Sequence, residues 1–575
     1  MLPKQKKYGT RLLSITLCLL SLLILTSCNI FGGGQKTFVK APADKQIYTI
    51  PEVGISTLDT LDPALAHDPA SMSAIEMIST GLVQLDNKLQ LHAQLAQSWG
   101  VGADGLTWTF HLKPQLKFSD GTPLTSADVA YSIDRALQPA TQSTVAPLYL
   151  SLIKDADQLL AGHITTLIGD SIQTPDPNTV VIITRKKAAY FPAMLTYTCS
   201  YVVEKSLITK YGQSFTSHLA EGGSTGPFKV AQSTPGVGIN FVPNPNYYGP
   251  KPQLRRVTLA FYPSADGAYQ AYLNNKVDMT GVPSSIFEAS KKRSDFFHIP
   301  QLWINYYTMN YLVKPFDSIH MRQAFALAID KNAIAKNVWK GAVIPTNHLV
   351  PQGMNGYNPN LTGPDGTQNL SGNAAKAQEL LRLGLQDEGW TSVSQVPPIT
   401  LTYTSGVSNL DQEVTAMIQM WQKVLGIRVS ANPVDYNTLL DQVTAATNSS
   451  NGLQFWGLAW VDEYPDPQDW LSLQFAKGVP NNNMNYGQNL GGTAAQQQAV
   501  QQQLATADAT MSEDARMQEY QKVEQQLVND VAWLPIEQVT ANFLRSPNIV
   551  GIVDNAQEII PPDDWANIYR VQEKN

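Results

Sequence analysis

The chain has 575 residues, of which 43% are hydrophobic and 15% charged, and its formal net charge at pH 7 is −7. A chain of this length and composition has enough apolar residues to form the cores of two or three domains. Its acidic excess argues against nucleic acid as a partner, because phosphate backbones attract basic surfaces.

The first 27 residues have the layout of a secretory signal peptide. Four basic side chains precede an apolar run of 14 residues from Leu12 to Leu25, which is typical of such a leader. Because a membrane-spanning helix needs about 20 residues, the run favours a signal peptide over a permanent anchor. It ends at Leu25-Thr26-Ser27-Cys28, which resembles the bacterial lipobox, where the cysteine receives a diacylglyceryl group. We therefore expect Cys28 to be lipidated.

The mature chain is expected to begin with a tether and to lack an internal disulfide. Residues 28–45 contain Gly32-Gly33-Gly34 and are predicted to be flexible. Loss of the leader removes four of the 40 basic side chains and none of the 47 acidic ones, so the mature chain is more acidic. Cys18 leaves with the leader and Cys28 is lipidated, so Cys199 has no disulfide partner. Stability must then come from a large apolar core.

Strands and helices are predicted to alternate along the chain. Apolar and polar side chains alternate from Leu106 to Leu112, which predicts a half-buried strand. A helix is predicted from Ser126 to Leu137, with Asp128 near its N-terminus, where the helix dipole favours a negative charge. Gln496 to Gln503 is predicted to be the solvated face of a helix. Similar patterns predict strands at 180–184, 257–261, 399–403 and 427–430, and helices at 321–329 after Asp317 and 413–425 between Asp411 and Gly426.

No catalytic residue, metal site or cofactor is predicted. None of the eight histidines lies within five residues of another, so no local histidine pair for zinc exists. The densest group of acids near aromatic residues is Asp462, Glu463, Asp466 and Asp469, and a glycosidase would place two acids beside sugar-stacking rings. The prolines within this segment indicate a rigid turn in which several of these acids are simply solvated.

A known family is suggested by a series of motifs. The stretch Lys117 to Val129, K-F-S-D-G-T-P-L-T-S-A-D-V, resembles the F/W-S-D-G-x-P-x-T-A-x-D signature of the family 5 extracellular solute-binding proteins, the oligopeptide, dipeptide and nickel receptors. Further motifs similar to those of this family follow in the same order and cover almost all of residues 46–575. They are Leu58 to Ala64, Ser224 to Lys229, Asn244 to Tyr248, Pro315 to Asp330 and Trp460 to Pro467.

Two of these motifs are expected to be structural. Ser119 to Pro123 has the chemistry of a tight turn, in which Gly121 is free to take a positive φ. Arg322 lies on a predicted helix that is rich in alanine, and we expect it to hold that helix in place instead of binding a ligand.

The resemblance implies an α/β, two-lobed periplasmic-binding-protein fold of type II, with the ligand enclosed between the lobes. It also implies an additional subdomain inserted in the N-terminal lobe. Placed by the motifs, lobe I comprises 46–83, 202–300 and 533–575, the inserted subdomain comprises 84–201, and lobe II comprises 301–532.

The resemblance further implies a ligand site along Ala459 to Pro467. In peptide-binding relatives the backbone of this segment pairs with an extended peptide, and the acid before the tyrosine binds the α-ammonium. That acid is Glu463 here. Because Glu is one methylene longer than the usual Asp, either Glu463 or Asp462 is expected to take this role. Oligopeptide receptors place arginines just before this segment to meet the peptide carboxylate, but residues 439–459 contain no Arg or Lys.

The other cleft residues implied by the motifs are mostly aromatic. Aromatic rings supply broad apolar pockets and sugar-stacking faces alike. Ordinary core packing is the alternative for each of them. The set comprises Ala459, Trp460 and Val461 of the segment, with Trp456, His67, Asp68, Trp303, Tyr306, Tyr307, Tyr403 and Tyr436.

The implied function is that of the substrate-binding lipoprotein of an ABC importer, which captures a peptide or another small ligand and delivers it to the permease subunits. Such a protein is expected to be monomeric, extracytoplasmic and attached to the cell membrane through the lipid on Cys28. The fold leaves other ligands open, such as an oligosaccharide or a metal chelate. A sensory or adhesive lipoprotein that imports nothing, and a glycosidase, are the alternatives from other classes.

Overall fold

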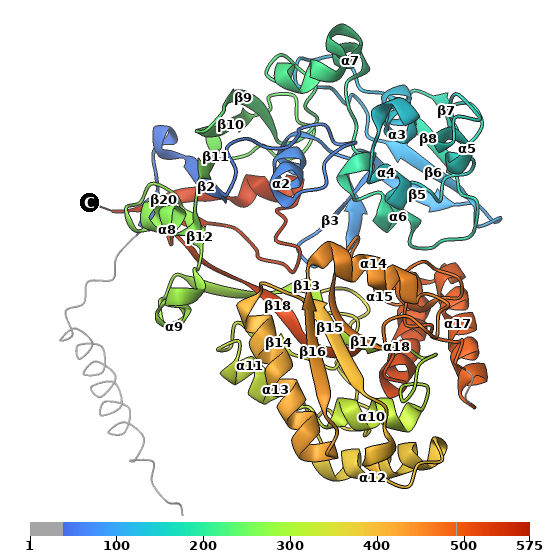
Figure 1. Ribbon diagram of the computed structural model, residues 1–575. Helices are drawn as coiled ribbons and strands as arrows, with labels where there is room; N and C mark the ends of the chain where they lie inside the picture. The colour runs from blue at the N-terminus through green and yellow to red at the C-terminus, as the bar shows by residue number, and fades with distance from the viewer. Residues whose placement is uncertain (1–37, 490–491, 575) are drawn as a thin grey trace, which may run out of the picture. The chain divides into compact units, whose positions relative to one another are not determined.

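The computed structural model describes residues 38–489 and 492–574. The predicted signal peptide, Cys28 and the first part of the tether lie outside these residues. The chain divides into two compact units. In the smaller one, β1 (Phe38–Lys40) pairs antiparallel with the last residues of β20 (Tyr569–Glu573). The larger unit, Ala43–Arg570, holds the other elements (Figure 1).

The first sheet of the larger unit joins strands that are far apart in the sequence. Its order is β2-β11-β10-β9, with β2 parallel to β11 and the other neighbours antiparallel. Tyr48, Phe241 and Leu259 from three of these strands share one core with Ile78 of α2 (Pro69–Ile78). The strands are β2 (Ile47–Val53), β9 (Phe228–Thr234), β10 (Gly238–Pro243) and β11 (Arg256–Tyr262).

The second sheet confirms the strand predicted at 106–112. All its neighbours are antiparallel, in the order β5-β6-β8-β7. The predicted helix is α3 (Ser126–Leu137), and the Asp128 carboxylate accepts the backbone amide of its N-cap, Thr125, at 2.8 Å. Phe110 and Ile182 of the sheet are buried with Val129 of this helix. The strands are β5 (Ala96–Val101), β6 (Thr107–Leu112), β7 (Ile172–Asp176) and β8 (Thr179–Ile183).

A seven-stranded sheet forms the largest layer, with helices on both faces (Figure 1). Its order is β12-β18-β13-β17-β15-β16, and β14 also pairs with β18. Two hydrophobic cores contain residues of this sheet. The first also contains residues of α10, α12 and α13, and the second also contains residues of α14, α17 and α18. The strands are β12 (Met279–Gly281), β13 (Phe296–Met309), β14 (Val343–Pro345), β15 (Ile399–Thr404), β16 (Val429–Val434), β17 (Phe455–Val461) and β18 (Leu534–Arg545); the helices are α10 (Ile319–Leu327), α12 (Ala374–Asp387), α13 (Ser408–Leu425), α14 (Tyr436–Ala446), α17 (Ala494–Ala509) and α18 (Glu513–Asn529).

Shorter elements connect these layers. A two-stranded sheet pairs β3 with β4. The remaining short elements are β3 (Val83–Leu85), β4 (Leu91–Ala93), β19 (Ile549–Val550), α4 (Ala146–Tyr149), α5 (Ala156–Leu160), α6 (Phe191–Met194), α7 (Lys205–Tyr211), α8 (Ala265–Leu273), α9 (Phe287–Ser290), α11 (Lys331–Asn337), α15 (Pro467–Trp470) and α16 (Ser472–Phe475).

The ends of several predicted elements differ from the sequence prediction. The helix predicted after Asp317 begins at Ile319, because the Ser318 hydroxyl caps it by accepting the amide of Met321 at 3.3 Å. The helix predicted after Asp411 begins earlier, at Ser408, and ends as predicted before Gly426, whose φ of 71° lies in the left-handed region that glycine favours. The strand predicted at 427–430 spans Val429–Val434 instead.

The predicted solvated helix face at Gln496 to Gln503 is confirmed for the exposed Gln496, Gln498, Gln502 and Gln503, but two glutamines of this helix face inwards. Gln497 and Gln501 of α17 are buried. The Gln497 carboxamide oxygen accepts the backbone amide of Gly487 at 2.9 Å. The Gln501 amide donates to the backbone oxygens of Phe475 and Tyr486, both at 2.9 Å. These side chains bind the loop before the helix, because buried polar backbone groups need partners.

The turn and the arginine that were predicted to be structural have those roles. Gly121 has φ of 100°, and the Asp120 carboxylate accepts the backbone amide of Thr122 at 2.8 Å. Arg322 is fully buried and donates to the backbone oxygens of Phe316 at 2.7 Å and Asp530 at 3.0 Å.

Two further observations concern cysteine and the membrane. Cys199 is buried, and it forms no disulfide within the described residues. Among the residues that the structure describes, no helix combines the length and the apolar character that crossing a membrane requires.

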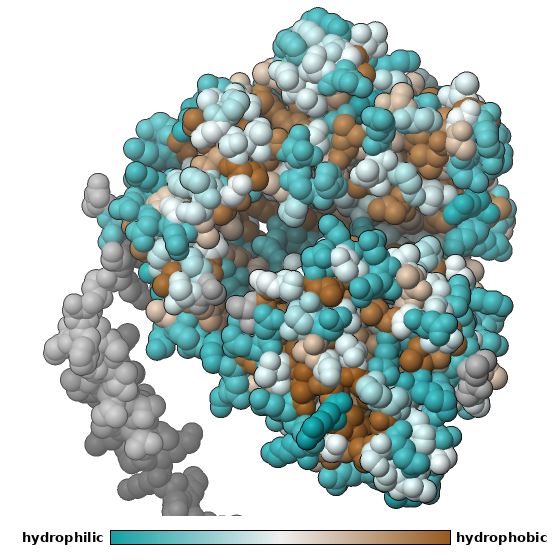
Figure 2. Space-filling view, viewed as in Figure 1, coloured by the Kyte–Doolittle hydropathy of each residue, from teal (hydrophilic) through white to brown (hydrophobic). Residues whose placement is uncertain are grey.

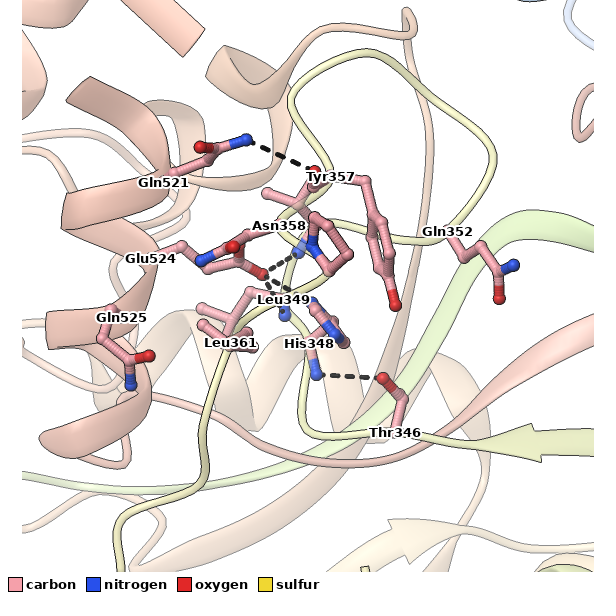
Figure 3. A network of polar contacts seen from close by, with 12 residues as sticks. Thr346, His348, Leu349, Gln352, Tyr357, Asn358, Leu361, Gln521, Glu524 and Gln525 are labelled. Atoms are coloured by element: carbon pink, nitrogen blue, oxygen red, sulfur yellow. Dashed lines mark hydrogen bonds and ion pairs between the residues drawn. The ribbon is translucent and has the colours of Figure 1, made fainter. Parts of the chain in front are cut away.

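A buried glutamate ties a long loop to the large sheet's helical layer (Figure 3). Glu524 of α18 accepts the backbone amides of Leu349 at 3.0 Å and Val350 at 2.9 Å with one carboxylate oxygen. The ring of His348 lies beside it and packs on Tyr357, with 4.3 Å between ring centroids. The loop after β14 therefore depends on this side chain for its hydrogen bonds.

Candidate ligand-binding site

Strand β17 lies inside the seven-stranded sheet, but only its first part has a strand on each side. β13 pairs with it along its whole length, from Met309 opposite Phe455 to Trp303 opposite Val461. On the other side β15 pairs only with Phe455 and Trp456. In the described parts of the chain, no strand pairs with residues 457–461 on that side. A strand edge left open in this way can accept an extended chain through main-chain hydrogen bonds.

Exposed apolar side chains accompany this open edge. Trp303 is 37% exposed and lies opposite Val461, which is 46% exposed. Tyr436, the first residue of α14, is 55% exposed. Figure 2 shows a recessed surface between the region of α14 and that of α2. Exposed apolar side chains of this kind are available to contact a ligand.

Asp462 and Glu463 follow the end of β17 and contact different parts of the chain. The Glu463 carboxylate accepts a hydrogen bond from the hydroxyl of Tyr149, the last residue of α4. The Asp462 carboxylate accepts one from the side-chain amide of Gln557. The ring of Tyr149 stacks on that of Tyr197, with 3.6 Å between the centroids. Both acids are half-buried, so each keeps part of its surface open.

A third carboxyl, that of Asp469 in α15, lies behind this pair. Its Oδ2 accepts the backbone amide of Glu463 at 2.9 Å and the indole N–H of Trp460 at 3.3 Å. Its Oδ1 is buried and has no hydrogen-bond partner in the described structure. Asp469 thus fixes the backbone that carries Glu463 and adds an acidic group beneath it.

Burial and mutual repulsion favour the protonated forms of two of these acids. Burial raises the pKa of Asp462 to about 7, against the lowering effect of the Gln557 hydrogen bond, and the charge of Glu463 raises it further. Burial also raises the pKa of Asp469 well above its usual range, and the charges of Glu463 and Asp462 raise it further. A desolvated carboxyl that lacks a cation resists ionisation in this way.

The predicted residues of the N-terminal part surround the start of α2. Asp68 caps this helix, and its Oδ1 accepts the backbone amide of Ser71 at 2.9 Å. His67 is exposed. Burial raises the pKa of Glu52 to about 7, and Asp68 raises it further. Burial is the main cause of the raised pKa of Tyr197, and the charges of Glu463 and Asp68 add to it.

Several predicted cleft aromatics lie in the packed cores. Tyr306 stacks on Trp533, with 3.6 Å between ring centroids. Tyr307 is buried, and its hydroxyl donates to Glu413 at 2.8 Å. Trp456 is buried between the same layers as Tyr306, and the buried Tyr403 donates to Asp411 at 2.9 Å. Core packing and internal hydrogen bonds account for these four rings.

Sequence reasoning missed Tyr149, Tyr197 and Gln557. Their contacts with the acidic segment join parts of the chain separated by 314 residues for Tyr149 and by 95 for Gln557. No motif or spacing marks such residues, because only the fold brings them to the strand end.

One sequence pattern typical of serine hydrolases also has a structural explanation. Gly222-Gly223-Ser224-Thr225-Gly226 fits G-x-S-x-G, which marks an exposed nucleophile on a sharp turn. Ser224 is fully buried, and its backbone amide donates to the Ser119 hydroxyl at 3.2 Å. The segment joins the turn at Ser119 instead of presenting a nucleophile. Within the described ranges, no three His, Cys, Asp or Glu residues are grouped so that they could hold a metal ion.

Comparisons with known proteins agree on one family. Residues 90–482 match the model of the bacterial extracellular solute-binding proteins, family 5. The chain is 23% identical over 547 residues to the oligopeptide-binding protein OppA of Bacillus subtilis, covering 94% of this chain and 96% of that protein. It is 26% identical to the periplasmic oligopeptide-binding protein OppA of Salmonella typhimurium, covering 88% and 90%.

Solved structures show the same fold. The murein tripeptide-binding protein MppA in its unliganded open form superimposes with a TM-score of 0.78 at 23% identity, covering 93% of this chain and 99% of that one. Listeria monocytogenes OppA bound to peptide gives a TM-score of 0.60 at 22% identity, covering 91% and 99%. The two-lobed α/β fold expected from the motifs is thereby confirmed.

Proposed function

The chain belongs to the bacterial extracellular solute-binding proteins of family 5, and we propose that it binds a peptide between its two lobes and delivers it to the permease of an ABC importer. Relatives named as oligopeptide-binding and dipeptide-binding proteins support a peptide ligand. The observation that carries the proposal is the open edge of β17, which ends in two acids.

Each part of this edge has a role in the proposed complex. The backbone of residues 457–461 adds the peptide as a further strand, which recognises any sequence because it uses main-chain groups. Trp303, Val461 and Tyr436 offer apolar contact to the peptide side chains. Glu463 receives the peptide α-ammonium, and Asp462 is the alternative acid for this role. Charge-assisted hydrogen bonds of this kind are short and strong.

The proposal also covers the domains and the location. Lobe I comprises 46–83, 202–300 and 533–575 with the subdomain 84–201 inserted, and lobe II comprises 301–532. Lipidation of Cys28 anchors the monomeric protein outside the cytoplasm beside its permease. The family is one of binding proteins, so we propose capture and release without a chemical step.

Mass spectrometry of the material that co-purifies with the protein tests this function. The protein is purified under native conditions and then denatured, and the released small molecules are sequenced. Peptides that are retained by the native protein and reduced by Glu463→Gln would support the proposal. Recovery of an oligosaccharide or a metal chelate in place of peptides would contradict it.

A further inference from the structure

Three acids lie close together in the chain just after β17. Asp462, Glu463 and Asp469 lie within one turn of chain and influence one another electrostatically. In the described residues, no Lys, Arg or His forms an ion pair with any of them, whereas Asp466 in the same turn is paired with Arg516 at 2.7 Å. Buried carboxylates are stable only when they are paired with a cation or protonated.

The structure itself leaves an acceptor open in this cluster. Asp469 is fully buried, its Oδ2 is bonded to the backbone of Glu463, and its Oδ1 has no hydrogen-bond partner in the described structure. Buried polar atoms without a partner are rare in folded proteins and call for a ligand, a proton or a water molecule. A proton accounts for the buried Asp469, so the observation that favours a positively charged ligand is that, in the described residues, no cation is paired with the half-buried Asp462 and Glu463.

We propose that this acidic cluster selects peptides whose first residue carries a basic side chain. The inference rests on the proposed peptide-binding function. Glu463 receives the α-ammonium and Asp462 receives the side-chain cation, while Asp469 acts as a positioning residue that holds the Glu463 backbone. The two acids already contact different residues, because Glu463 is hydrogen-bonded to Tyr149 and Asp462 is hydrogen-bonded to Gln557.

An aromatic pair lies beside Glu463, the acid proposed for the α-ammonium. The rings of Tyr149 and Tyr197 stack against each other, and Tyr149 is bonded to the carboxylate. Tyr149 is buried, whereas Tyr197 is partly exposed, and the face of an aromatic ring attracts an ammonium group. A neutral first residue would make no charge-assisted contact with Asp462 and would leave it with the neutral Gln557 as its hydrogen-bond partner.

Calorimetry with two matched peptides tests the inference. The probes are Arg-Ala-Ala-Ala-Ala and the same peptide with citrulline in place of arginine, which keeps the shape and the free α-ammonium but removes the side-chain charge. We expect the arginine peptide to bind at least about tenfold more tightly, since charge-assisted hydrogen bonds are stronger than neutral ones. Asp462→Asn should reduce this preference to below about threefold.

A surface variant provides the control. Asp170→Asn also removes one acid, but Asp170 is exposed and paired with Lys154 at 2.7 Å, so the preference should remain. Equal affinity of the unmodified protein for both peptides would overturn the inference and leave the peptide-binding function standing. Binding of neither peptide would overturn both. If Asp462→Asn does not fold, the comparison of the two peptides on the unmodified protein still decides.

Discussion

The hydroxyl of Tyr149 donates a hydrogen bond to the carboxylate of Glu463, a residue 314 positions later in the sequence. Tyr149 ends the short helix α4, and Glu463 follows the open edge of β17. The bond fixes one oxygen of the acid that we propose for the peptide α-ammonium and leaves the other oxygen for the ligand. Tyr149 is thus proposed to position this acid.

Removal of this hydroxyl should weaken peptide binding. A hydrogen bond to a charged group is worth about 1.5 to 3 kcal/mol, and Tyr149→Phe removes one that holds Glu463. We expect an affinity loss of about tenfold, measured by calorimetry. Tyr131→Phe, on α3, removes a hydroxyl elsewhere and should leave the affinity unchanged. Tighter binding by Tyr149→Phe would show that the hydroxyl competes with the ligand.

Low pH should stabilise the ligand-free protein. Burial raises the pKa of Asp462 to about 7 from 3.8, and those of Glu52 and Glu76 to about 7 from 4.5. The folded protein therefore binds more protons than the unfolded chain between about pH 4 and pH 7. The stability that these groups contribute is fully present below that window and is lost as the pH rises through 7.

Peptide affinity should change with pH in the opposite direction. An ammonium group is bound by ionised carboxylates, so affinity should fall as the pH drops below about 7. Thermal melting of the free protein and calorimetry with one peptide, each at pH 5.5 and pH 7.5, measure the two trends. Asp462→Asn should reduce both. A melting temperature and an affinity that both rise with pH would contradict this assignment of the buried acids.

The loop after β14 should depend on Glu524 for its stability. Glu524→Ala leaves the backbone amides of Leu349 and Val350 without an acceptor, and each unsatisfied buried group costs about 1 to 3 kcal/mol. We expect the free energy of unfolding, measured in urea, to fall by about 2 to 4 kcal/mol. Glu524→Gln keeps an oxygen acceptor and should cost less. Equal losses for the two variants would mean that the charge, and not the two amide bonds, matters.

The lipid anchor is tested in cells. Cys28 lies outside the described residues, and its role follows from the Leu-Thr-Ser-Cys junction after the leader. Cys28→Ser should release soluble protein or leave an unprocessed precursor, because two or three acyl chains are needed for stable anchoring. Fractionation followed by immunoblotting measures this. A Cys28→Ser protein that is still processed and fully membrane-bound would exclude lipidation at this residue.

Local pattern was sufficient for much of the fold. Strand β6 and helix α3 agree with the prediction because alternation and a capping box are encoded in neighbouring residues. Whether an aromatic residue lies in the core or in the cleft was harder to predict. Trp456 and Tyr307 lie on strands covered by helices on both faces, and such strands show no alternation that would separate core from cleft.

Only the site residues that lie next to one another in the sequence could be predicted. Asp462 and Glu463 belong to one motif, whereas their partners Gln557 and Tyr149 come from distant segments. The open edge of β17 begins where its pairing with β15 stops, at Thr402 opposite Trp456, although β15 itself continues to Thr404. Contacts of this kind are created by tertiary structure and leave no periodicity in the sequence.

The central claim is that a peptide is held by its α-ammonium at the end of β17. Calorimetry compares a peptide that binds the unmodified protein with its N-acetylated form, on the unmodified protein and on Glu463→Gln, Asp462→Asn and the double variant. We expect acetylation of the peptide, and substitution of the acid that binds the α-ammonium, each to weaken the affinity by about tenfold to a hundredfold. The two changes together should cost little more than either alone, because they remove the same interaction. Tight binding that acetylation leaves unchanged would contradict the claim.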